Sequence, residues 1–170
     1  MAGSGSTVLA WIHCRAAYIV SEQNPIRVFV SHVFSEHPDY FRVFEYLESS
    51  PNFFYTNCSD VTKMPTTGGK AAVKDALREQ IAAAEAVVII SSMYSESREW
   101  IAYQMDVADA NELPLIALEP FGGAGAVPEE VQGRAAEVVP WNERMMVDAI
   151  KRQARHEETT RWDVIEFDMS

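Results

Sequence analysis

Short apolar runs alternate with amphipathic stretches from residue 25 to about residue 155. Apolar, β-branched runs predict strands, and apolar positions spaced three and four residues apart predict helices. The third apolar run has no polar alternation, which is typical of a strand covered on both faces. The predicted strands are IRVFVSH (26–32), NFFYTNC (52–58), AVVIISS (86–92), LPLIALEP (113–120) and AAEVVPW (135–141), and the predicted helices cover 38–50, 68–85, 98–110 and 142–155.

This alternation predicts an α/β fold with a parallel sheet between layers of helices. Right-handed crossovers leave few topologies for such a chain. We therefore expect a flavodoxin-like sandwich of five parallel strands flanked by helices, in the order 2-1-3-4-5.

The pattern divides the chain into three parts. Residues 1–24 form an N-terminal extension, residues 25–155 the domain, and residues 156–170 a C-terminal tail. The extension holds an apolar piece, for which packing on the domain edge is favoured over a self-association contact. The tail alternates apolar and polar residues from Trp162 to Phe167, which is compatible with an additional edge strand.

Composition narrows the classes of partner. The 170 residues fit one domain, and their net charge is −11, from 14 basic and 25 acidic residues. This balance argues against binding to nucleic acid or to an anionic membrane surface, while a small anionic ligand stays open. The two cysteines, Cys14 and Cys58, form no disulfide framework, and no apolar run reaches the ~20 residues of a membrane span, so a cytoplasmic protein is expected.

Candidate chemistry lies where the predicted strands end, because ligands of such sheets bind outside the carboxyl ends of the strands. The loop from Asp60 to Lys70 is long and contains two glycines, as a mobile flap would, although a plain connector is the commoner outcome. Neither a Walker loop nor a dinucleotide-binding glycine motif is present. The four histidines are scattered, so no metal site is predicted. The residues at the strand ends are Ser31, His32, Phe34 and Ser35, then Asn57, Ser59 and Asp60, then Ser91, Ser92, Met93 and Tyr94, and last Glu119, Pro120 and Phe121.

The stretch SSMYSESREWIAYQMDVADA (91–110) is the most informative of these. Trp100 and Gln104 are four residues apart, so they share one face of the predicted helix. His32 could act as a general base, but a lone histidine at a strand end is more often a structural hydrogen-bond partner.

Several segments resemble a known family. RVFVSHVFSEHPDYFRVFEYLE, ALREQIAAAEAVVIISSMYSESREWIAYQMDVA, LPLIALEPFG and AAEVVPWNERMMVDAIKR are similar to the TIR-like proteins of bacterial Thoeris anti-phage systems. The resemblance covers about residues 25–152. Its most specific parts are FVSH after the first strand, the serine, tyrosine and tryptophan around 91–100, and the closing VPWN segment.

The resemblance implies an enzyme that uses NAD⁺ as its substrate and needs no cofactor. TIR proteins of this type cleave the bond between nicotinamide and ribose as glycohydrolases or ADP-ribosyl cyclases. Their ADP-ribose-derived product is a second messenger that acts on a separate effector protein. Homo-oligomers are also expected, because TIR sites are often completed between copies.

Gln104 stands where the family has its catalytic glutamate. Glutamine keeps the shape of glutamate but has no negative charge to support a cationic transition state, so this chain is expected to be inactive or trapped. Two explanations remain open: a native glutamine in a non-catalytic nucleotide- or protein-binding scaffold, or an engineered replacement. The otherwise complete cleft favours the second. Carried over by position, the resemblance assigns substrate contacts to Phe29, Ser31, His32, Phe34, Ser91, Tyr94 and Trp100.

Overall fold

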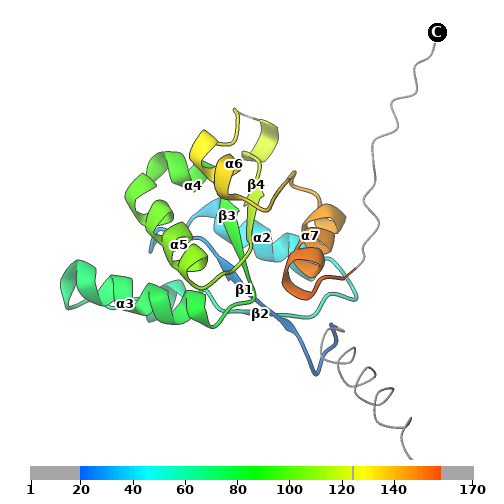
Figure 1. Cartoon of the computed structure of the whole chain (residues 1–170), viewed down its shortest axis with the longest axis horizontal. Helices are drawn as coiled ribbons and strands as arrows, with labels where there is room; N and C mark the ends of the chain where they lie inside the picture. The colour runs from blue at the N-terminus through cyan, green and yellow to red at the C-terminus, as the bar shows by residue number, and fades with distance from the viewer. Residues whose placement is uncertain (1–19, 124, 158–170) are drawn as a thin grey trace, which may run out of the picture.

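The computed structural model describes residues 20–123 and 125–157 of the chain (Figure 1). Five strands alternate with helices in the predicted order. The strands are β1 (Ile26–Val30), β2 (Tyr55–Asn57), β3 (Ala86–Ile90), β4 (Leu115–Leu118) and β5 (Glu137–Val139). The helices are α2 (Pro38–Glu48), α3 (Gly69–Ala82), α4 (Ser91–Glu96), α5 (Arg98–Ala110), α6 (Glu129–Arg134) and α7 (Glu143–Arg155), with 3₁₀ turns η1 (Val61–Lys63) and η2 (Phe121–Gly123).

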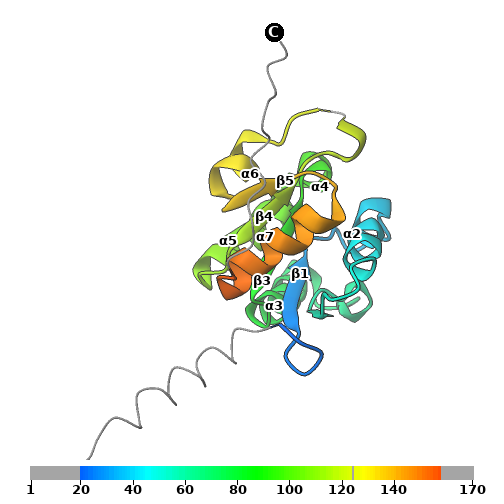
Figure 2. The same cartoon turned by 90° about the vertical axis from the view of Figure 1, so that its right-hand side faces the viewer.

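The strands form one parallel sheet in the order β2-β1-β3-β4-β5, which confirms the predicted α/β, flavodoxin-like topology. Helices α2 and α7 pack together on one face, and α3 and α5 pack together on the other (Figures 1 and 2). Strand β3 is central, and all five of its residues are buried, as its unbroken apolar run predicted.

Two local features differ from the prediction. The third strand ends at Ile90, and Ser91 and Ser92 begin helix α4. Helix α6 was not predicted, because its six residues, EEVQGR, contain a single apolar side chain, Val131, and therefore no helical apolar repeat.

Residues 1–19 of the extension and 158–170 of the tail lie outside the described residues, and so does the predicted edge strand from Trp162 to Phe167. No helix within 20–123 and 125–157 has both the length and the apolar character needed to cross a membrane.

Candidate functional site

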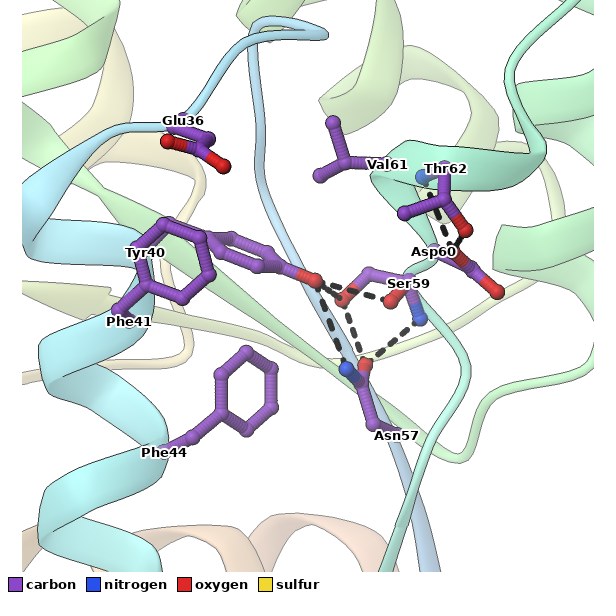
Figure 3. A pocket seen from close by; sticks show the side chains of 9 residues that line it. All are labelled: Glu36, Tyr40, Phe41, Phe44, Asn57, Ser59, Asp60, Val61 and Thr62. Carbon is purple, nitrogen blue, oxygen red and sulfur yellow. Dashed lines mark hydrogen bonds between the residues drawn. The ribbon is translucent and has the colours of Figure 1, made fainter.

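A cavity of about 480 Å³ opens at the carboxyl ends of β1 and β2. Helix α2 lines one side with the rings of Tyr40, Phe41 and Phe44, and the segment after β2 lines the other with polar side chains (Figure 3). Glu36, from the loop after β1, lies at its rim. The cavity therefore joins aromatic surface to carboxylates, as a site for a ligand with a ring and hydroxyl groups requires.

Hydrogen bonds connect the two sides of this cavity. The Tyr40 hydroxyl donates to the backbone carbonyl of Ser59 at 2.9 Å and lies 3.0 Å from its Oγ. Asn57 accepts from the Ser59 hydroxyl at 2.6 Å and donates to Tyr40 at 3.4 Å (Figure 3). This network fixes the position of the polar wall against α2.

Asp60 is the ionised group of that wall. Its Oδ1 accepts from the backbone amide of Thr62 at 3.0 Å and from the Thr62 hydroxyl at 2.6 Å. Its Oδ2 lies 3.1 Å from Lys63 Nζ. The Thr62 and Lys63 bonds lower the pKa of Asp60 to about 2, so the carboxylate stays charged at neutral pH.

Gln80, on α3, holds the backbone of Asp60 through a pair of hydrogen bonds. The Asp60 N–H donates to Gln80 Oε1, and Gln80 Nε2 donates to the Asp60 carbonyl, both at 3.0 Å. An amide side chain can satisfy a donor and an acceptor of one residue at the same time. Gln80 thereby fixes the loop that carries the carboxylate.

Gln104, on α5, makes the same pair of bonds with His32. The His32 N–H donates to Gln104 Oε1 at 3.1 Å, and Gln104 Nε2 donates to the His32 carbonyl at 2.7 Å. The Gln104 side chain is fully buried. We call these two arrangements the amide clamps, since each helix glutamine pairs with the backbone just beyond a strand.

The clamp bears on the two explanations of Gln104. A carboxylate here would place an acceptor oxygen against the acceptor carbonyl of His32, so only an amide or a protonated acid makes both bonds. Both Oε1 and Nε2 of the buried amide thus have a backbone partner. The clamp gives Gln104 a structural role and is compatible with both explanations.

The imidazole of His32 lies in an aromatic enclosure. Its ring centroid is 5.6 Å from that of Phe29, 5.5 Å from Phe34 and 6.0 Å from Tyr40. Burial lowers the pKa of His32 to about 4, although Gln80 and the Asp60 charge act in the opposite direction. The ring is therefore neutral at pH 7.

Phe34 and Trp100 also meet here. Their rings pack edge to face at 4.8 Å, and both are half-buried. The structure thus brings Phe29, His32, Phe34, Trp100 and Gln104 into one cluster beneath the loop that follows β1.

The two predicted serines have structural hydrogen bonds instead of free hydroxyls. Ser31 Oγ accepts from the Ile90 amide at 2.9 Å, which ties β1 to β3. The Ser91 hydroxyl donates to the carbonyl of Leu118, which ties β3 to β4. Both side chains are buried.

Tyr94 points to another part of the molecule. Its hydroxyl donates to Glu130 at the start of α6, and Arg98 bonds the same carboxylate at 2.9 Å. The bond to Glu130 and burial both raise the pKa of Tyr94, with burial the larger cause. The structure therefore separates Tyr94 from the cluster around His32.

No nearby glutamate replaces the missing carboxylate at position 104. Glu99 is 65% exposed and pairs with Lys70 at 2.9 Å. Glu96 is 60% exposed and lies 3.4 Å from His37 Nε2. The carboxylates at the cavity, Asp60 and Glu36, are the better placed candidates.

Comparison with protein-family models decides the family. Residues 29–123 match the TIR-like domain of Thoeris protein ThsB, which is more than half of the 170 residues. The chain belongs to this TIR-like family. It is thus a TIR-domain protein of anti-phage defence, as the resemblance implied. No curated protein matches the chain.

Within this TIR-like domain, the cavity residues were only partly foreseen. Asn57, Ser59 and Asp60 were candidates because they follow a strand, whereas Tyr40 and Phe41 were assigned only to a helix by their spacing. Their position next to the strand end depends on how α2 crosses the sheet. The signal that could have found them is the aromatic run at the start of that helix.

Proposed function

We propose that this TIR-like domain binds and cleaves NAD⁺ and forms an ADP-ribose-derived second messenger in anti-phage defence. The observation that carries the proposal is the ionised Asp60 carboxylate in a cavity walled by aromatic rings. Family membership adds that the fold is one on which this chemistry is expected.

The reaction breaks the bond between the nicotinamide nitrogen and the ribose carbon. Nicotinamide leaves as a neutral molecule with the bonding electron pair, and the ribose carbon becomes cationic. Water or a hydroxyl of the ligand then adds to that carbon and loses its proton. A fixed carboxylate next to the ribose stabilises the cationic transition state, because it supplies negative charge where positive charge develops.

In this proposal Asp60 has that role and Gln104 has a structural one. Asp60 keeps its charge at neutral pH, and the Gln80 clamp holds its backbone. Gln104 has no charge, and its amide is engaged with His32. Tyr40, Phe41 and Asn57 would contact the rings and hydroxyls of the nucleotide.

The test is nicotinamide release from NAD⁺, measured by chromatography on dilute and on concentrated protein, since the site could be completed between copies. Asp60→Asn should lower the rate by about 10²- to 10³-fold. Asp75→Asn is the matched control, because Asp75 is exposed and pairs with Arg78 on the same helix, α3. An equal rate in Asp60→Asn and the original protein would refute the role of Asp60.

Gln104→Glu separates the two explanations of position 104 in the same assay. A large rise in release would mean that a glutamate belongs at this position. The clamp predicts no rise, because the introduced carboxylate would oppose the His32 carbonyl.

A second candidate is a non-catalytic scaffold that binds NAD⁺ or a related nucleotide without turnover. The neutral, buried Gln104 favours it. Calorimetry distinguishes the two: binding of NAD⁺ with no nicotinamide release supports the scaffold, and neither binding nor release refutes both.

The remaining proposals concern partners. We expect copies of the chain to associate, the product to act on a separate effector protein, and the protein to work in the cytoplasm without nucleic acid or membrane. Size-exclusion chromatography with and without NAD⁺ tests the first of these.

A further inference from the structure

The imidazole of His32 is a buried polar group that the proposed cleavage at Asp60 does not use. Neither ring nitrogen makes a hydrogen bond of normal geometry among residues 20–123 and 125–157, although the Gln80 amide lies close enough to raise the pKa of the ring, and the side chain is fully buried. Nearly all buried polar side-chain atoms in folded proteins have such partners, so an exception calls for a physical reason. A neutral imidazole offers one donor and one acceptor, and here both are unused.

Phe34, two residues later, has a second unfavourable feature. Its φ is +65°, in the left-handed region that bulky side chains rarely adopt. Such backbone conformations persist where the surroundings impose them, and they cluster at ligand-binding and switching sites. The Phe34 ring packs edge-on against both His32 and Trp100, and these contacts oppose the backbone preference.

The rings around His32 differ in the elements that hold them. Phe29 lies in β1 and Tyr40 in α2, and both are buried. The backbone of His32 itself is held by the Gln104 clamp. Among the three rings found to pack on His32, Phe34 is the one in a loop, and it is partly exposed to solvent.

We propose that Phe34 is a movable cover over a concealed binding site, and that its displacement opens the His32 imidazole to hydrogen-bond a ligand. The ligand group that fits is a neutral carboxamide, because it can donate to one imidazole nitrogen or accept from the other. The strained backbone of Phe34 relaxes when the cover opens, which offsets part of the lost ring contacts. The choice of nicotinamide as the carboxamide rests on the proposed function, whereas the cover does not.

The test follows the His32 ring by nitrogen NMR in the full chain labelled at histidine. The ionisable groups that face the ring are Asp60 and Tyr40. Neither residue is substituted in the variants that are compared. Phe34→Gly removes the cover and permits the positive φ, so the fold is retained, and Phe34→Leu keeps an apolar side chain of smaller size. Phe121→Ala is the control, because Phe121 is an exposed phenylalanine that packs on Trp141 and does not belong to the lining of the cavity.

We expect the pKa of His32 to rise from about 4 toward its ordinary value of about 6.5 in Phe34→Gly, less in Phe34→Leu, and not in Phe121→Ala. Nicotinamide should perturb the His32 ring signals of the original protein, and at concentrations at least about tenfold lower in Phe34→Gly, because no cover has to be displaced. An unchanged titration in Phe34→Gly would overturn the cover. A changed titration without any response to nicotinamide would overturn the carboxamide assignment.

These outcomes are separable from those of the proposed function. The titration uses no ligand and needs no turnover. Nicotinamide release from NAD⁺ together with an unchanged His32 titration in Phe34→Gly would support cleavage and refute the concealed site. A changed titration without nicotinamide release would support the concealed site and refute cleavage.

Discussion

The side-chain amide of Gln104 pairs with both backbone groups of His32, across 72 positions of sequence. Helix α5 is thereby fixed to the end of β1, at the point where the chain leaves the sheet. Because the pairing needs a donor and an acceptor on one side chain, it distinguishes glutamine from glutamate.

Gln104→Glu should destabilise the fold at neutral pH by about 1–3 kcal/mol, because a buried acceptor would face the His32 carbonyl. Burial raises the pKa of the introduced acid above its unfolded value, and the protonated acid restores the donor. The loss of unfolding free energy in Gln104→Glu is therefore small at pH 4 and grows as the pH rises. Urea unfolding at several pH values measures it.

Gln132→Glu is the control for the added negative charge, because Gln132 is exposed on α6. The amide clamp would be contradicted by a Gln104→Glu protein whose unfolding free energy matches that of the control throughout this pH range.

The second clamp predicts a local effect near the cavity. Gln80→Met keeps the length of the side chain but removes both bonds to Asp60. The amide hydrogen of Asp60 should then exchange faster, by roughly 10-fold for each 1.4 kcal/mol of lost local stability. Glu79→Met, at the adjacent exposed position of α3, should leave exchange in residues 57–64 unchanged. Equal exchange in the two variants would show that Gln80 does not position this loop.

The fold was predictable because most of its strands and helices have a recognisable pattern of apolar residues within their own sequence. Residues 86–90 are β-branched and apolar throughout except for Ala86, and α7 has the apolar spacing and the Asn142 cap of an amphipathic helix. Of the α-helices, α4 and α6 were not predicted, since a helix of six residues has too few positions to show a period.

The site was less predictable because its contacts are between distant residues. The sequence pointed to His32, Trp100 and Gln104, but not to the pairing of an amide with a backbone. Ser31 and Ser91 looked like ligand-facing hydroxyls at strand ends, and both are used to tie neighbouring strands. Tyr94 lies in α4, which the break at Ser97 separates from α5, so its neighbour is Glu130.

The buried His32 predicts a loss of stability in mild acid. Its pKa is about 4 in the folded protein against about 6.5 unfolded, so below pH 6.5 the unfolded chain takes up a proton that the folded chain does not. Stability should fall as the pH drops from about 6.5 to about 4, by up to about 3 kcal/mol from this residue. His32→Asn should flatten this part of the pH profile, whereas His156→Asn, at an exposed residue, should not. A profile for His32→Asn parallel to that of the original protein would refute the assignment to His32.

The start of α3 predicts a difference between two adjacent glycines. Gly68 and Gly69 both have positive φ, of +90° and +64°. A Cβ at Gly68 would lie 2.7 Å from the Cβ of Ala72, whereas one at Gly69 would meet nothing within 4 Å. Gly69→Ala should therefore cost about 1 kcal/mol for its backbone conformation, and Gly68→Ala at least about 2 kcal/mol, with the close contact added.

A double-mutant cycle isolates that contact. Ala72→Gly should cost about 1 kcal/mol alone, as glycine does within a helix, but much less in the Gly68→Ala background, where it removes the clash. Additive unfolding energies would mean that the loop shifts to accommodate the Cβ. In that case the segment between Asp60 and α3 is more flexible than the Gln80 clamp at Asp60 implies. The cavity wall that this segment supports would then adapt to its ligand instead of being preformed.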